Sequence, residues 1–172
     1  MNLGNRRIKN PELRVEFEQL GFADVATFRA SGNVIFGSEG GESEAALTKT
    51  IESGLVGGLG YDVPVFLRSA AEVESIAARE PFEANLVAAS SGKLQVLLLT
   101  NRPTAKARKT VLGLATGEDL LAIEGRELYW LPSGGTIDSD LDLKAIDSSL
   151  GKGTMRTMGT VAQIAAKHCA AG

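Results

Sequence analysis

The run Leu94–Leu99, LQVLLL, decides the fold because it is almost uninterrupted apolar sequence. A run of this kind is typical of a strand that is covered on both faces, so we expect it at the centre of a sheet. A basic helix over about 104–114 is predicted next. A hairpin then follows, with arms 120–123 and 127–131 that meet at Gly125.

The sequence after this hairpin predicts two helices and one short strand. Ser139 and Asp142 have the spacing of a capping box, which predicts a helix that ends before Gly151. A short strand over about 154–158 and a terminal helix over about 160–168 complete the chain. The order strand, helix, strand, strand, helix, strand is that of a split βαβ unit of ferredoxin-like type.

The first half has a similar pattern but begins with a helix. Asn10 is the predicted cap of this helix, and the glycines from Gly57 onward are expected to end the second helix. Pro64 places the last strand at a sheet edge, and Ser69 with Glu72 predicts a capping box. The elements predicted for this half are a helix over about 11–20, hairpin arms over 25–30 and 33–36, a helix over 43–56, an edge strand over 63–67 and a helix over 69–79.

These patterns predict an α+β chain of two ferredoxin-like halves in tandem, residues 1–81 and 93–172, joined by a linker over 82–92. The first half lacks its opening strand, which would lie between two neighbouring strands. Without it, each buried unpaired backbone group would cost about 1–3 kcal/mol. We therefore expect Met1 to be an internal methionine of a longer chain, or another segment to supply the strand.

Composition narrows the class of protein. The 172 residues include 18 basic and 21 acidic side chains, so the whole molecule carries no field that would attract nucleic acid or an anionic membrane. The single cysteine, Cys169, cannot form an internal disulfide, and His168 beside it lies at the chain end. There is no secretory or membrane-spanning apolar run, so we expect a cytoplasmic location.

Nucleic-acid recognition is not favoured by the local motifs either. Arg102, Lys106 and Lys109 share one predicted helical face, but a basic face of this size is usually only solvated. Tyr129 and Trp130 are predicted to point to opposite faces of a sheet, so one ring at most would stack on a base. We expect no nucleic-acid partner.

The most suggestive stretch lies ahead of the first helix. Gly4, Arg6 and Arg7 combine a flexible backbone and cationic side chains with a helix N-terminus, a combination that suits a phosphate or carboxylate. Arg29 and Asn33 in the hairpin are the expected neighbours of this site. The leading hypothesis is a binding module for a small anionic ligand, with no cofactor and no resident metal.

Two alternatives remain open. One is a metal-assisted hydrolytic enzyme that uses Asp138, Asp140 and Asp142, although acidic residues at a helix start are also explained by the helix dipole. The other is a protein-interaction domain whose exposed sheet edge pairs with a second copy or with a partner segment.

Several strings together resemble the bacterial domain-of-unknown-function family 1697 over nearly the whole chain. They are Asn2–Gly4, Leu20–Phe22, Ser31–Phe36, Val63–Ser69, Gly125–Tyr129, and the Thr154, Arg156 and Thr160 pattern. The family begins with a strand, so the resemblance also implies the missing one. Thr157 and Met158 replace its Asn-Trp pair, and Asp140 replaces a lysine. The resemblance implies no reaction, substrate or cofactor because the family is uncharacterised.

Overall fold

The computed structural model of the protein describes residues 2–3, 6–137 and 139–169. The chain divides into two compact units, residues 1–67 and 68–172. The predicted linker 82–92 differs from this division, because it belongs to the second unit and contains a short helix. Among the described helices, none is long and apolar enough to cross a membrane.

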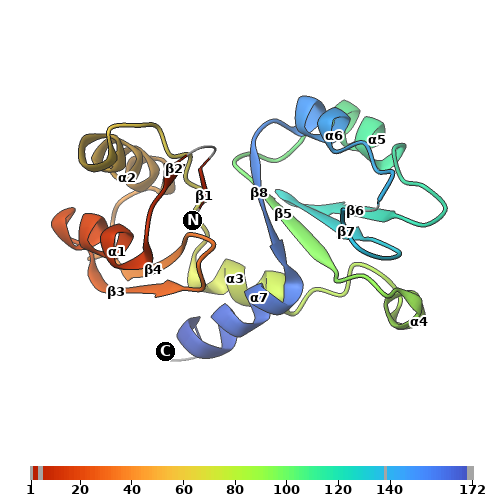
Figure 1. Ribbon diagram of the computed structural model, residues 1–172, viewed down its shortest axis with the longest axis horizontal. Helices are drawn as coiled ribbons and strands as arrows, with labels where there is room; N and C mark the ends of the chain where they lie inside the picture. The colour runs from red at the N-terminus through yellow and green to blue at the C-terminus, as the bar shows by residue number, and fades with distance from the viewer. Residues whose placement is uncertain (1, 4–5, 138, 170–172) are drawn as a thin grey trace. The chain divides into compact units, whose positions relative to one another are not determined.

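The described part of the first unit contains two antiparallel strand pairs and two helices (Figure 1). In chain order the elements are β1 (Asn2–Leu3), β2 (Arg6–Arg7), α1 (Asn10–Gln19), β3 (Ala23–Phe28), β4 (Asn33–Gly37) and α2 (Glu44–Leu59). β1 pairs with β2, and β3 pairs with β4. The predicted first helix and the predicted hairpin are thus confirmed.

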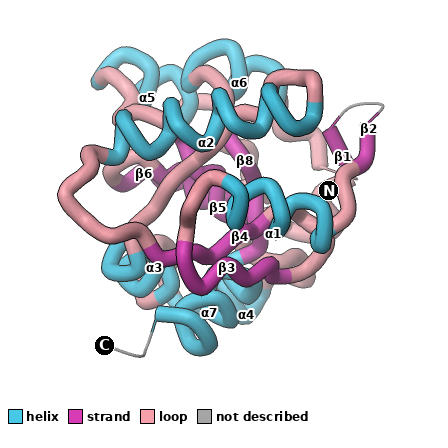
Figure 2. The backbone as a smooth tube through the Cα atoms, turned by 90° about the vertical axis from the view of Figure 1, so that its left-hand side faces the viewer, coloured by secondary structure: helices cyan, strands magenta, loops and turns pink. Residues whose placement is uncertain are grey.

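The core of the first unit explains the helical spacing of its apolar residues. α1 packs against β3, and Figure 2 shows it alongside the β3–β4 hairpin. Leu13 and Phe17 of α1 are buried together with Ile51 and Leu55 of α2. The ring of Phe17 lies 5.3 Å, centroid to centroid, from that of Phe36 on β4. Burial of these side chains supplies most of the driving force for the unit.

The second helix is longer than predicted. α2 continues through Gly57 and Gly58 and ends at Gly60, whose φ of +74° is the left-handed conformation that glycine adopts most easily. A Cβ added at Gly58 would collide with the carboxylate of Glu16 on α1. This glycine therefore faces the Glu16 side chain of α1 from inside α2 and does not end the helix.

The prediction of a paired strand over 63–67 is wrong. The segment has no ladder partner among the described residues, and the sheet of β3 and β4 contains no third described strand. The backbone N–H of Val65 instead donates to the Glu52 carboxylate of α2 at 3.1 Å. A side chain thus supplies an acceptor where the prediction expected a strand carbonyl.

The second unit contains a four-stranded antiparallel sheet of order β6-β7-β5-β8 (Figure 1). Its elements are α3 (Ala70–Ala77), α4 (Ala84–Ala89), β5 (Gln95–Leu99), α5 (Ala105–Leu112), β6 (Leu120–Glu124), β7 (Glu127–Leu131), α6 (Leu143–Leu150), β8 (Gly153–Thr157), α7 (Met158–Ile164) and a π-helical turn (Ala165–Cys169). β5 lies between β7 and β8, which confirms the central position predicted from its apolar run.

Both faces of this sheet are covered, as the run at β5 predicted. Tyr129 and Trp130 point to opposite faces, and each ring is almost fully buried. Helices α3 and α7 pack on one face, and α5 and α6 on the other. The two buried clusters are Ile76, Val96, Tyr129 and Val161, and Val111, Ile123, Leu128, Trp130, Leu141 and Ile146.

Two local predictions in this unit need correction. Ser139 does not cap α6; Asp142 is the N-cap, and its carboxylate accepts from the Ala145 N–H at 2.9 Å. Arg102 precedes the N-cap of α5, Thr104, so it shares no helical face with the lysines of that helix. The class is mixed α and β with antiparallel sheets, in agreement with the α+β prediction at that level.

Candidate functional site

The predicted cationic segment lies on a short strand that leads into α1. Arg6 pairs with Leu3 and Arg7 with Asn2 across the β1–β2 ribbon. The next residue, Ile8, is buried in the core of the first unit, which fixes the path of the chain between β2 and α1. Gly4 of the predicted site lies outside the described residues.

The predicted neighbours of this segment form the turn between β3 and β4. Arg29 has a φ of +58°, a left-handed conformation that is uncommon for a residue with a Cβ. The Asn33 side-chain amide donates to the carbonyl of Phe28 at 3.0 Å and to the Ser31 hydroxyl at 2.9 Å. Asn33 therefore holds the shape of the turn, and the Arg29 guanidinium lies 5.7 Å from the centroid of the Phe28 ring.

One hydrogen bond joins the two predicted segments. The side-chain amide of Asn10, the first residue of α1, donates to the backbone carbonyl of Arg29 at 2.9 Å. Asn10, predicted as the cap, thus tethers the turn, while Lys9 occupies the N-cap and its own side chain makes no capping hydrogen bond. We call Arg6, Arg7, Lys9, Asn10 and Arg29 the basic junction.

The basic junction also contains a nearby carboxylate. Glu12 in the first turn of α1 accepts from the Lys9 backbone N–H at 3.0 Å. An acidic side chain at this position is stabilised by the positive end of the helix. The junction has four basic residues and this one carboxylate in its composition, whereas the whole chain has a net charge of -3.

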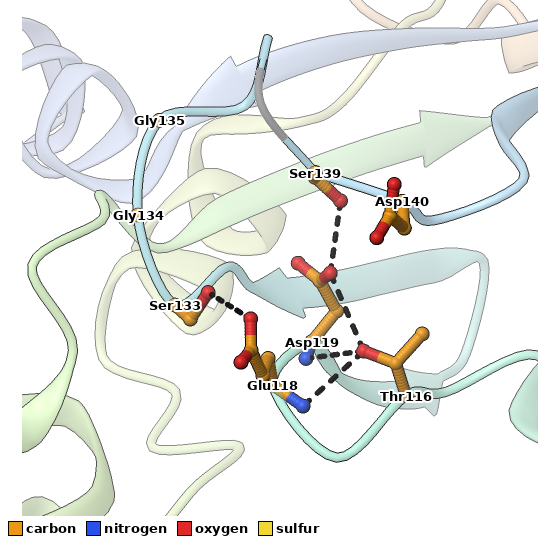
Figure 3. Close-up of a pocket in the computed structure, with 8 residues that line it drawn as sticks. All are labelled: Thr116, Glu118, Asp119, Ser133, Gly134, Gly135, Ser139 and Asp140. Atoms are coloured by element: carbon orange, nitrogen blue, oxygen red, sulfur yellow. Dashed lines mark hydrogen bonds between the residues drawn. The ribbon is translucent and has the colours of Figure 1, made fainter.

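A polar pocket of about 160 Å³ lies in the second unit (Figure 3). We call it the Asp119 pocket. Its lining contains three carboxylate side chains and three hydroxyl side chains: Thr116, Glu118, Asp119, Ser133, Gly134, Gly135, Ser139 and Asp140. No basic side chain lines it, so the pocket repels the anionic ligands that the basic junction suits.

Asp119 is the best-connected residue of this pocket. Its carboxylate accepts from the Trp130 indole N–H at 2.7 Å and from the Ser139 hydroxyl at 2.9 Å. The Asp119 backbone N–H donates to the Thr116 hydroxyl at 2.8 Å, as Figure 3 shows. Our sequence analysis missed this group. The available signal was the buried Trp130, because an indole N–H in a core requires an acceptor.

The residues predicted for a metal-assisted reaction do not form a ligand set in the described chain. Asp142 is engaged as the cap of α6, Asp140 is an exposed residue of the Asp119 pocket, and Asp138 lies outside the described residues. In the parts of the chain that the structure describes, no three carboxylate, thiol or imidazole groups converge in the geometry of a metal site.

A second polar cluster of this unit is structural. The Arg68 guanidinium donates to the Glu127 carboxylate at 2.9 Å and to the carbonyl of Leu99 at 2.9 Å, and its side chain is almost fully buried. Arg126 pairs with Glu72 at 2.8 Å. Burial raises the pKa of Glu72, but hydrogen bonds from Ser69 and Arg126 outweigh it and hold that pKa below its ordinary value.

Burial shifts the pKa values of three further groups in this unit, Tyr129, Cys169 and Arg156. Burial, aided by the charge of Glu127, raises the pKa of Tyr129 to about 12. Burial, with a contribution from Glu74, raises the pKa of the Cys169 thiol, so the thiolate nucleophile is disfavoured. Burial lowers the pKa of Arg156, which donates to the Thr154 hydroxyl and the Met155 carbonyl, each at 2.7 Å.

Comparison with known proteins places the chain in a family. Among solved structures it is similar to the conserved bacterial protein SP0830 from Streptococcus pneumoniae, with a TM-score of 0.74 and 20% sequence identity over 97% of this chain and 94% of that one. At this identity the likeness establishes the fold. No curated protein matches the chain. Residues 1–129 match a family described as "Protein of unknown function (DUF1697)", and because this match covers most of the sequence, the chain belongs to that family.

Proposed function

We propose that the protein binds a small anionic ligand at the basic junction. The observation that carries the proposal is the 2.9 Å hydrogen bond from the Asn10 side chain to the Arg29 carbonyl. Arg29 is separated from Arg6 and Arg7 by more than twenty residues in sequence, and this bond anchors its backbone at the start of the helix that follows them.

The chemistry of the junction favours oxyanions. Arginine presents planar, bidentate donors that match a phosphate or a carboxylate, and the first amides of a helix add partial positive charge. The left-handed backbone of Arg29 gives further support, because strained residues are concentrated at ligand-binding positions. A compact anion with two or more charges, such as a phosphorylated metabolite, uses these features best.

The strand order also supports a more specific proposal for the fold of the two units. We infer that the second unit is a ferredoxin-like half, because in its order β6-β7-β5-β8 the first strand lies between the third and the fourth. We propose the same plan for the first unit, with the segment 63–67 as the counterpart of the fourth strand.

Isothermal titration calorimetry with inorganic pyrophosphate tests the proposal. We expect binding by the full chain at low ionic strength, and a loss of about tenfold or more in affinity for the variant Arg6→Ala/Arg7→Ala. Arg29→Ala is expected to weaken binding as well. Arg14→Ala is the matched control, because Arg14 lies on α1 but pairs with Glu18 at 2.6 Å.

The controls make the result decisive. Arg14→Ala removes one positive charge from the same unit, as Arg29→Ala does, and is expected to bind pyrophosphate as the unaltered chain does. Equal affinities for all the variants, or no heat of binding with the unaltered chain, would reject the proposed site.

A further inference from the structure

The distribution of charge along the chain is uneven around α5. No acidic residue occurs between Glu83 and Glu118, although acidic residues outnumber basic ones in the chain as a whole. Five basic residues lie in this interval: Lys93, Arg102, Lys106, Arg108 and Lys109. Four of the five are in α5 or in the turn that precedes it.

The fold presents most of these charges to solvent. Val111 on the inner side of α5 is fully buried against the sheet, so the opposite side of the helix faces outward. Lys106 and Lys109 are exposed and lie three residues apart, which places them side by side on this outer face. Beside them are small exposed residues, Ala105 and Thr110, which leave room for another chain to approach closely.

The cations of α5 lack a carboxylate partner in the described chain, although Lys109 lies in the last turn, where the negative end of the helix dipole stabilises a cation. Within the described residues, Arg102, Lys106, Arg108 and Lys109 form no ion pair with a carboxylate. Lys106 also lies in the first turn of α5, where the positive end of the helix dipole opposes a cation. Lys106 therefore does not stabilise the helix, and its exposed charge is accessible to an external anion.

The surroundings of α5 define the class of partner. α5 packs beside α6, whose Asp142 and Asp147 are exposed, and Glu118 follows α5 in sequence. A nucleic-acid strand or a membrane surface extends far beyond α5 and would meet these carboxylates. A nucleic-acid strand gains no compensating stacking from Trp130, because this ring is buried and cannot stack on a base.

A short segment avoids this repulsion because it contacts the cations alone. α5 has eight residues and is about 12 Å long, a length that about four residues of extended chain would span. We propose that the outer face of α5, together with Arg102, binds an acidic polypeptide segment of a partner protein. The required chemistry is three or four carboxylates in close succession.

Fluorescence polarisation with a fluorescein-labelled peptide of ten glutamates tests this proposal on the full chain. We expect binding at low ionic strength that weakens steeply as salt is added, because the contacts are solvent-exposed charges. Lys106→Glu/Lys109→Glu should weaken binding about tenfold or more, since each substitution replaces an attraction with a repulsion. Arg102→Glu, outside the helix, should weaken it several-fold independently of any effect on helix stability.

Lys49→Glu is the matched control, because Lys49 is an exposed residue of α2 and the change in charge per site is the same. It should leave the affinity within about twofold. Equal weakening by Lys49→Glu would show a general charge effect and overturn the proposal. So would tighter binding of a ten-nucleotide oligothymidylate, or of phosphatidylserine vesicles, than of the peptide, because either result would assign the face to another class of partner.

Discussion

Replacement of Asp119 by alanine gives a sharp test of the packing in the second unit. The side chains of Asp119 and Trp130 belong to residues that are 3% and 2% exposed, and the indole N–H donates to the carboxylate at 2.7 Å. Removing the carboxylate leaves this N–H without its acceptor in a site that water reaches poorly. The Ser139 hydroxyl loses its acceptor as well.

The cost follows from the two shorter of the three lost bonds, since the third, from the Thr116 hydroxyl, is long at 3.4 Å. A buried donor left unsatisfied costs about 1–3 kcal/mol, and a partly exposed hydroxyl bonded to a carboxylate adds about 1 kcal/mol. We therefore expect Asp119→Ala to lower the free energy of unfolding by about 2–4 kcal/mol. Asp119→Asn keeps an oxygen that can accept from the indole and should lose about half as much.

Urea unfolding followed by tryptophan fluorescence measures this effect directly, because Trp130 is the one tryptophan of the sequence. The midpoint should shift with little change in the slope of the transition. Asp140→Ala is the control: it removes an exposed carboxylate from the same pocket and should change stability by less than about 0.5 kcal/mol. An Asp119→Ala variant as stable as the control would refute the assigned role of the carboxylate.

Two further predictions concern the same unit. Gly92→Ala should destabilise it by about 1–3 kcal/mol in thermal unfolding, because the added Cβ would meet the carbonyl oxygen of Gly134, whereas Gly117→Ala has open space and should be close to neutral. Glu72→Gln should alter the pH dependence of stability. The folded-state pKa of Glu72 is lowered, so its contribution is fully present above its ordinary pKa of 4.5 and is lost as pH falls through the lower folded-state value. The difference between Glu72→Gln and the unaltered chain should therefore be constant above about pH 5.5 and shrink below about pH 4.5; a constant difference down to pH 3 would contradict it.

The second unit could be predicted well from sequence because its signals are local and agree with one another. The apolar run at β5 requires cover on both faces, and the alternation around Tyr129 and Trp130 places one ring on each face. The first unit was harder. A glycine such as Gly58 is typical of a helix end. Here it lies inside α2 and faces the Glu16 side chain, and that contact is not visible in the sequence.

For the candidate sites as well, contacts between residues far apart in sequence could not be predicted. The basic residues before α1 are adjacent in sequence and were recognised, whereas the bond from Asn10 to Arg29 depends on how α1 packs beside the hairpin. The Asp119 pocket was missed because its lining comes from two loops that are separate in sequence, the one before β6 and the one between β7 and α6. Local patterns thus predicted where the basic residues and most elements lie, although Asn10 and Ser139 are not the caps expected, and tertiary packing determined which residues meet.

The two proposed surfaces differ in the kind of anion they suit, and this difference separates their tests. A compact dianion such as pyrophosphate needs several donors around one point, whereas Lys106 and Lys109 lie on a convex helix surface beside exposed small residues. An extended acidic segment needs the opposite arrangement, a row of separate charges. Lys106→Glu/Lys109→Glu should therefore leave pyrophosphate binding unchanged, and Arg6→Ala/Arg7→Ala should leave peptide binding unchanged. If either pair of substitutions weakened both ligands equally, the anions would be responding to net charge, and neither surface would be a specific site.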